Sequence, residues 1–235
     1  HHPFIIEPPL ESVRVYRPKE RMLFNLILIG RAIDYLPYFI YTFDELGKTG
    51  IGKGRGRYNL IEATEDSRVV YSSEDKTVRN SAHNELNMPE ITDIETASDS
   101  AVTLKFITPL RINYNRDLVV DLEFHILITS LLRRLCLLYY FHCENREPAW
   151  DHKELIRRAE KVAVEKSDLK WRDWERYSSR QDTRIKMGGL VGDITFIVDV
   201  GPFIPLLKAG EMLHIGKGTS FGLGKYEMDK RQKLT

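Results

Sequence analysis

The stretch that decides the fold of this chain is LHIGKGTSFGLGKY, residues 213–226. It contains four glycines, two lysines, one threonine and one serine, and no acidic residue. Glycine lets the backbone turn so that several N–H groups point to one side, and the lysines add positive charge. The stretch is therefore suited to holding an anion such as a phosphate group.

Two phosphate-binding motifs do not fit this stretch. A Walker A loop requires Ser or Thr directly after its lysine, whereas Gly218 follows Lys217, and Gly210 lies one position too far from Gly216. The dinucleotide fingerprint G-x-G-x-x-G requires a glycine where this chain has Phe221. An enzyme that acts on a nucleotide phosphate is therefore only the third of our hypotheses.

The same order of features occurs twice in the chain. The run Ile-Gly-Lys-Gly stands at residues 51–54 and again at residues 215–218. Each run follows a stretch typical of a helix and precedes a strand-like stretch that begins near Tyr58 or Tyr226. This order predicts an internal duplication of one α/β unit, each copy reading helix, glycine-rich basic loop and strand.

Composition sets the class of protein. The 235 residues are 42% hydrophobic and 29% charged, an ordinary balance for a soluble globular protein. The formal net charge is only +1, so a polyanionic partner must be bound by local basic patches. We expect no metal ion, no cofactor and no association with a membrane.

The longest apolar run, residues 122–141, carries Arg133 and Arg134 in its middle, which predicts a buried helix of a cytoplasmic protein. Cys136 and Cys143 would lie about 10 Å apart along that helix, too far for a disulfide. We expect both to be free thiols.

The second half of the chain shows the element order of a ferredoxin-like unit, β-α-(α)-β-β-α-β, which many RNA-recognition modules use. The expected elements are a strand at 102–107, helices at 121–143 and 153–165, a hairpin of 169–177 with 184–198, a helix at 202–210 and a strand at 221–228.

The first half holds fewer elements. We expect extended segments at 4–10 and 12–29, a helix at 33–46, a strand at 58–63, a hairpin at 68–77 and a polar linker at 80–100. The predicted fold class is α+β, with tandem ferredoxin-like (RRM-like) βαββαβ units. Residues 1–95 would form a partial first domain, truncated at its N-terminus, and residues 96–235 a complete second domain.

One arm of the predicted hairpin is rich in cations. Alternation along the strand gives one face Lys170, Arg172, Trp174 and Arg176, and the other face Trp171, Asp173, Glu175 and Tyr177. Cations beside an aromatic ring suit a phosphate backbone and a stacked base, and Arg180 adds charge at the turn. The alternative is a solvated hairpin whose charges pair across the strands.

A second basic patch contains Lys48, Lys53, Arg55 and Arg57 and no acidic residue. Such a patch predicts phosphate contacts, which give affinity but little sequence readout. The alternative is a glycine loop whose cations only keep the surface soluble.

Histidine is the natural general base for RNA cleavage because its pKa lies near neutral pH. His214 borders the glycine-rich stretch, but an ordinary structural histidine is the better interpretation for each histidine taken alone. We assign no catalytic residue.

Several stretches resemble the CRISPR-associated RAMP endoribonucleases that process precursor crRNA. They are MGGLVGDI (187–194), PFIPLL (202–207), HIGKGTSFGLG (214–224), WRDWERYSSRQ (171–181) and the block from Leu28 to Gly56. The resemblance implies a tandem ferredoxin-like fold whose glycine-rich loop and basic hairpin contact repeat RNA. It also implies metal-independent cleavage, in which the ribose 2′-OH attacks the adjacent phosphate with help from a histidine on the first helix of the first domain.

The leading hypothesis is therefore an endoribonuclease that cleaves precursor crRNA repeats. The alternative is a non-catalytic crRNA-binding subunit of an effector complex. The expected partners are CRISPR repeat RNA and other effector subunits. The expected RNA contacts are Lys53, Arg55, Arg57, Lys170, Arg172, Arg176, Arg180, His214, Gly216, Lys217, Gly218, Thr219, Ser220 and Lys225.

Overall fold

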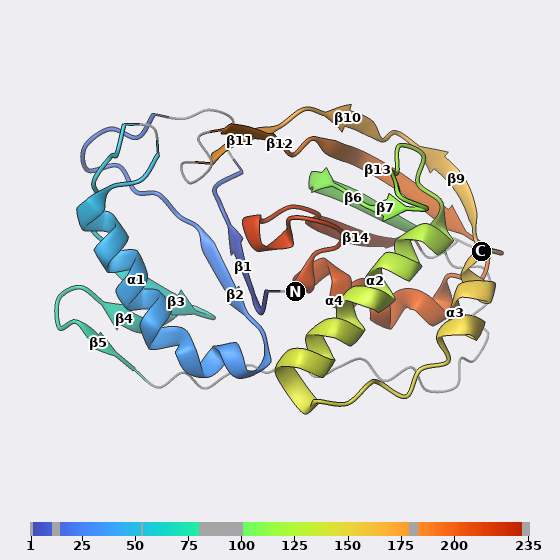
Figure 1. The fold of residues 1–235 in the computed structure, drawn as a ribbon, viewed down its shortest axis with the longest axis horizontal. Coiled ribbons are helices and arrows are strands. Elements are labelled where there is room, and N and C mark those ends of the chain that lie inside the picture. The colour runs from blue at the N-terminus through green and yellow to red at the C-terminus, as the bar shows by residue number, and fades with distance from the viewer. Residues whose placement is uncertain (1, 11–14, 53, 80–100, 179–182, 232–235) are drawn as a thin grey trace. The chain divides into compact units, whose positions relative to one another are not determined.

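The computed structural model describes residues 2–10, 15–52, 54–79, 101–178 and 183–231 (Figure 1). The chain divides into two compact units, His1–Ile27 with Met88–Thr235, and Leu28–Asn87. The predicted domain boundary at residue 95 lies outside the described residues and stays a prediction. Helices and antiparallel sheets make up both units, so the α+β class is confirmed.

The larger unit is built on one five-stranded antiparallel sheet, ordered β10-β13-β6-β14, with β9 also paired to β13 (Figure 1). Its elements in chain order are β6 (Ala101–Leu110), α2 (Phe124–Tyr139), α3 (His152–Ala159), β9 (Ala163–Ser167), β10 (Lys170–Arg172), β13 (Gly189–Ile197), α4 (Ile204–Leu213) and β14 (Tyr226–Arg231). With β9 and β10 taken as one broken strand, the spatial order of the four strands is fourth, first, third, second. This is the predicted ferredoxin-like arrangement, which is confirmed here.

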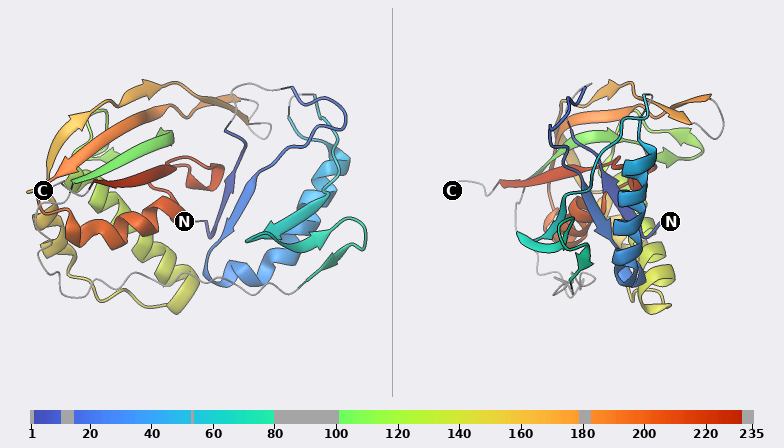
Figure 2. Two further views of the ribbon diagram at one scale, coloured as in Figure 1. Left: turned by 180° about the vertical axis from the view of Figure 1, so that it is seen from behind. Right: turned by 90° about the vertical axis from the view of Figure 1, so that its left-hand side faces the viewer.

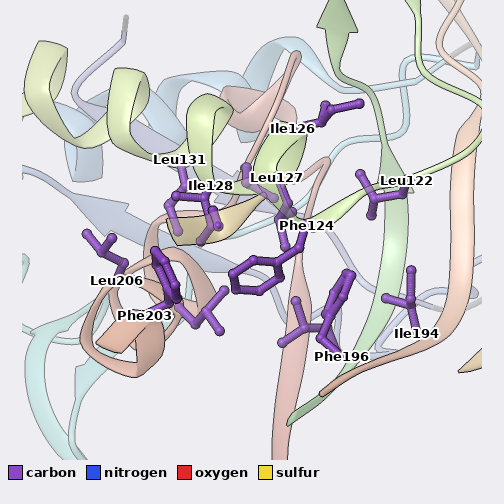
Figure 3. Packing of buried hydrophobic residues seen from close by; sticks show 14 of the residues in the cluster. Leu122, Phe124, Ile126, Leu127, Ile128, Leu131, Ile194, Phe196, Phe203 and Leu206 are labelled. Carbon is purple, nitrogen blue, oxygen red and sulfur yellow. The ribbon is translucent and has the colours of Figure 1, made fainter. Parts of the chain in front are cut away.

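The core lies between this sheet and helices α2 and α4. The ring of Phe124 on α2 packs edge-on against Phe196 of β13 at 4.8 Å and against Phe203 at 5.1 Å (Figure 3). Leu127 and Leu131 on the same helix have no solvent exposure. Phe203 belongs to a short 3-10 turn, Gly201–Phe203, that leads into α4. These contacts join two helices to the centre of the sheet.

The apolar run at residues 122–141 was predicted to form a core helix, and it forms helix α2. Among the described residues, Phe124–Glu144 is the one helix that passes a membrane-span test by length and hydropathy. Its inward side is packed in the core, and the guanidinium of Arg134 is buried, where its Nε donates to the carbonyl of Leu213 at 2.9 Å. Arg134 therefore satisfies a free carbonyl at the end of α4. Both cysteines are free, as predicted.

Several predicted ends were wrong. The predicted helix 121–143 is α2 followed by a π-helical turn, Tyr140–Glu144, and the helix predicted to reach residue 165 ends at Ala159 because 163–167 pairs with β13 as β9. Strand β6 runs through Pro109, since the pairing with β13 is irregular between Leu190 and Gly192 and proline is tolerated at such a bulge. The last strand begins at Tyr226 because Thr219–Phe221 forms a 3-10 turn.

The remaining strands of the larger unit are short. They are β1 (Phe4–Glu7), which pairs with β2 (Asn25–Leu28), β7 (Asn113–Tyr114), which pairs with β8 (Asp117–Leu118), and β11 (Glu175–Ser178), which pairs with β12 (Thr183–Lys186). Figure 2 shows the ribbon from behind and from the side.

The smaller unit holds a 3-10 helix (Gly30–Tyr35), helix α1 (Leu36–Thr49) and a sheet ordered β3-β4-β5. The strands are β3 (Glu62–Glu65), β4 (Arg68–Ser72) and β5 (Thr77–Val78). The predicted helix and hairpin are confirmed, and the strand predicted at 58–63 begins later, at Glu62. The described part of this unit has fewer elements than a complete βαββαβ unit.

Candidate nucleic-acid interface

The C-terminal glycine loop, Ile215–Gly224, is closed by backbone hydrogen bonds. The N–H of Ile215 donates to the carbonyl of Gly224 at 3.1 Å, and the N–H of Gly224 donates to Pro109 on β6, also at 3.1 Å. Gly224 has φ +71°, and a Cβ built there would lie 1.8 Å from the carbonyl oxygen of Ile215. Only glycine fits this position, so the loop is held in one shape at the end of the central sheet.

The N-terminal glycine loop, Ile51–Gly56, is closed in the same way. The N–H of Ile51 donates to the carbonyl of Gly56 at 3.0 Å, which matches the bond between Ile215 and Gly224. In each copy a cation and then a tyrosine follow the closing glycine, Arg57-Tyr58 in one and Lys225-Tyr226 in the other.

The two tyrosines are anchored alike. The hydroxyl of Tyr58 donates to Phe43 in helix α1 at 2.7 Å, and the hydroxyl of Tyr226 donates to Leu207 in helix α4 at 2.5 Å. Each tyrosine also lies close to a helical glycine, although through different atoms. An added Cβ at Gly47 would come within 2.3 Å of the backbone carbonyl oxygen of Tyr58, and one at Gly210 within 2.4 Å of the hydroxyl oxygen of Tyr226. The two copies therefore share their loop closure and their helix contact, which supports the predicted duplication.

His214 lies in a buried polar cluster behind the C-terminal glycine loop. Its side chain has no solvent exposure, its Nε2 contacts the carboxylate of Glu7 at 2.7 Å, and its Nδ1 contacts the carbonyl of Leu223 at 3.1 Å. Glu7 also accepts from Lys225 Nζ at 2.9 Å and from the amide of Asn25 at 2.8 Å. These contacts tie strand β1 to the loop.

The cluster explains the ionisation of Glu7. The hydrogen bond with His214 and the contacts with Asn25 and Lys225 lower the pKa of Glu7 to about 2, against the opposing effect of burial. The carboxylate of Glu7 and the carbonyl of Leu223 are both acceptors, so each ring nitrogen of His214 faces an acceptor within the chain. Sequence reasoning missed Glu7, although a carboxylate at the end of the apolar run Phe4-Ile5-Ile6 was a usable signal for a buried partner.

The basic hairpin is longer than any of its strands. Arg172 of β10 faces Gly189 of β13, and Glu175 of β11 faces Lys186 of β12, so three positions separate the pairs on both arms. The backbone N–H of Met187 donates to Trp174 between them at 2.7 Å. The two strand pairs therefore form one hairpin in a continuous register.

This register confirms the two predicted faces for the residues whose side chains are described. Cross-strand partners share a face, so Lys170, Arg172 and Trp174 lie with Met187. On the opposite face, Trp171 donates from Nε1 to Asp173 at 2.9 Å, and Arg184 pairs with Glu175 at 3.5 Å. The second face therefore engages its charges within the hairpin, and the first face is the candidate binding face.

The C-terminal glycine loop meets this binding face. A Cβ on Gly218 would lie 3.2 Å from Cε of Met187, and the N–H of Lys217 donates to the carbonyl of Arg111 at 2.8 Å. The guanidinium of Arg111 donates in turn to the carbonyls of Lys186 and Gly188 in the hairpin. Arg111 thus links the loop to the hairpin, and Gly218, the neighbour of exposed Lys217, lies against Met187, which shares its face with Trp174.

The structure separates the predicted contacts into groups. Exposed side chains belong to Arg55, Arg57, Lys170, Arg172 and Lys217, while Gly216, Gly218, Ser220 and Lys225 are partly exposed and Thr219 and His214 are buried. Lys53 and Arg180 lie outside the described residues, and Arg176 is described only in its backbone. Within this set, the structure places Gly218 of the loop next to Met187, on the hairpin face that carries Lys170 and Arg172.

Comparison with known proteins gives the class first. Residues 104–226 match the model of the CRISPR-associated endoribonuclease Cas6, and residues 1–83 match a model described as an N-terminal domain. The first match spans more than half of the chain. The chain therefore belongs to the Cas6 family of CRISPR-associated endoribonucleases, whose role is CRISPR RNA processing.

Particular relatives are distant. An uncharacterized protein of Archaeoglobus fulgidus is 24% identical over 241 residues, which cover 96% of this chain and 72% of the relative. The product complex of a Thermus thermophilus Cas6 superposes with a TM-score of 0.57 at 15% identity, covering 97% of this chain and 82% of that one. A chain of a partial Cas6-RT-Cas1–Cas2 complex superposes with a TM-score of 0.57 at 16% identity, covering 99% of this chain and 39% of that one. At these identities the structures show the fold, which in Cas6 is a tandem of ferredoxin-like units.

Proposed function

We propose that this chain binds CRISPR repeat RNA and processes precursor crRNA as an endoribonuclease in the cytoplasm. The observation that supports the RNA contact is the meeting of the hairpin face that carries Lys170, Arg172 and Trp174 with the glycine loop that carries Lys217. The partners would be repeat RNA and other CRISPR effector subunits.

The chemistry of this surface suits RNA rather than a neutral ligand. Each lysine or arginine that contacts a phosphate releases condensed counterions, so affinity depends on salt concentration. A tryptophan ring stacks on a base whatever its identity. Since the chain as a whole has a formal net charge of only +1, the attraction to RNA must come from local groups of cations such as this one.

The proposed cleavage needs no metal ion. The ribose 2′-OH attacks the adjacent phosphorus, the bond to the 5′ oxygen breaks, and the products carry a 2′,3′-cyclic phosphate and a 5′-OH. We assign no general base, and His214 is not proposed for this role because its side chain is buried and both ring nitrogens have partners within the chain. The second candidate function is a crRNA-binding subunit that does not cut.

The RNA contact is tested by removing three cations together. Fluorescence anisotropy with labelled repeat RNA would compare the wild type with the Lys170→Ala/Arg172→Ala/Lys217→Ala variant over a range of salt concentrations. We expect the slope of log K against log salt to fall by about 2, since each lost phosphate contact to a single strand removes about 0.7. The matched control is Lys186→Ala, an exposed cation on the opposite face of the hairpin. An unchanged slope in the triple variant would remove this surface from the RNA contacts.

A further inference from the structure

The two glycine loops are closed by the same hydrogen bond, from the isoleucine N–H to the last glycine. They differ in the contacts of the cation that follows that glycine. In the C-terminal copy, Lys225 binds Glu7 at 2.9 Å, and strand β1 covers the loop, because a Cβ on Gly222 would lie 2.9 Å from the carbonyl of Ile6. Lys225 keeps only 25% of its side-chain exposure. Its charge is therefore used inside the protein.

In the N-terminal copy the equivalent cation is Arg57. Its side chain is exposed and makes no ion pair with any residue in the described part of the chain, and the same holds for Arg55. Residues 48–57 contain no acidic residue. The neighbouring Lys48 is different, because it pairs with Asp44 at 3.4 Å and with Glu45 at 2.5 Å on helix α1. Among the described residues, these two guanidinium groups thus have no ion-pair partner beside the glycine loop.

The shape of this loop is fixed without its cations. Gly50 has φ +85°, and a Cβ there would lie 2.2 Å from the carbonyl of Arg55, so the backbone crosses itself closely at the base of the loop. The reciprocal bonds between Ile51 and Gly56, 3.0 and 2.9 Å, hold that crossing. Replacing Arg55 or Arg57 therefore changes charge and leaves the bonds that close the loop in place.

We propose that the N-terminal glycine loop is a separate site for the phosphodiester backbone of RNA, bound by Arg55 and Arg57, whereas Lys225 at the equivalent position of the other copy is a structural anchor. The two equivalent positions, Arg57 and Lys225, therefore have different roles in the two copies. Guanidinium groups suit phosphate because they donate two parallel hydrogen bonds. The site reads the RNA backbone and not its sequence. This inference rests on the proposed function only in taking RNA as the ligand.

The test compares the equivalent positions directly. Repeat-RNA binding and thermal unfolding would be measured for the wild type, Arg55→Ala/Arg57→Ala, Lys225→Ala and Lys48→Ala. We expect the double variant to lower the salt slope by about 1.4, two contacts at about 0.7 each, with an unchanged unfolding midpoint. Lys225→Ala should lower the midpoint with an unchanged salt slope, and Lys48→Ala should change neither.

The outcomes distinguish this inference from the proposed function. An unchanged slope in Arg55→Ala/Arg57→Ala, with a reduced slope in the hairpin triple variant, would overturn the inference and leave the proposed function standing. If Lys225→Ala lowers the salt slope of RNA binding at a temperature where the variant is still folded, Lys225 contacts RNA, and the proposed division of roles is overturned. A wild-type chain that does not bind repeat RNA would overturn both.

Discussion

At the scale of single residues, Glu7 connects strand β1 to both ends of the C-terminal glycine loop. Its carboxylate accepts from His214 and Lys225, at the two ends of the C-terminal glycine loop, and from Asn25 of β2. A carboxylate that is largely withdrawn from water is stable only when such donors replace its hydration. Glu7 therefore both requires and stabilises the arrangement of β1 against the loop.

Replacing Glu7 by Gln removes the charge and keeps the size of the side chain. We expect Glu7→Gln to lower the free energy of unfolding by about 3 kcal/mol at neutral pH, because the pKa of Glu7 is about 2 in the folded chain and 4.5 when the side chain is unperturbed. Urea denaturation at pH 7 measures this difference. Glu227→Gln, at an exposed position of β14, is the control and should leave the free energy unchanged.

The contribution of Glu7 to the free energy of unfolding depends on pH. Folding lowers the pKa of Glu7, so its contribution is complete above pH 4.5 and is lost as pH falls toward 2. The stability difference between the wild type and Glu7→Gln should shrink over that range. A difference that stays constant down to pH 2 would show that the charge of Glu7 is not its cause.

His214 shows what could not be predicted at this scale. Its position beside a glycine-rich loop made it a candidate for RNA contact, yet its side chain is buried and both ring nitrogens have partners. The partner Glu7 is 207 positions away along the chain, and no local pattern shows such a contact. Lys217, three positions further along the chain, was also predicted to contact RNA, and its side chain is exposed, as such a contact requires.

At the scale of elements, the hairpin was predictable because alternation in a strand depends only on local geometry. Trp171 and Trp174 lie on opposite faces because the register is continuous, although β10 ends at Arg172 and β11 begins only at Glu175. The end of helix α3 was not predictable in the same way. Residues 163–167 take the strand conformation because they pair with β13, a tertiary contact that overrides local helix propensity.

The two tryptophans give a matched test of the binding face. Trp174 and Trp171 are 36% and 42% exposed and lie on opposite faces, and Trp171 is hydrogen-bonded to Asp173. We expect Trp174→Ala to weaken repeat-RNA binding about 10-fold, since stacking on one base contributes about 1–3 kcal/mol. Trp171→Ala should leave the affinity unchanged. Equal losses in the two variants would argue against a face-specific contact, and anisotropy titration at fixed salt decides between them.

At the scale of the whole molecule, the ferredoxin-like order of the larger unit could be predicted from the alternation of strand and helix patterns. The duplication could also be predicted, because Ile-Gly-Lys-Gly and the following tyrosine recur in the same order. What the sequence could not show is that both copies use the same bonds, Ile to Gly and Tyr to a helix carbonyl. Nor could it show that only the C-terminal copy has its cation neutralised by β1.

Under the proposed function, these observations belong to one reaction on CRISPR RNA. The binding face, the C-terminal loop and the N-terminal loop would hold the RNA, and cleavage would follow from attack by its own 2′-OH. This reaction needs correct placement of the scissile phosphate more than it needs any group that the protein adds.

The most direct measurement is cleavage of repeat RNA by the full-length protein in the presence of a chelator. Two substrates would be compared, one of natural RNA and one with a single 2′-deoxy nucleotide at the cleavage site. We predict that the natural RNA is cut to a product with a 2′,3′-cyclic phosphate and that the substituted RNA stays intact. Cleavage of the substituted RNA would contradict the mechanism, and tight binding without cleavage of either substrate would contradict the endoribonuclease in favour of the non-catalytic subunit.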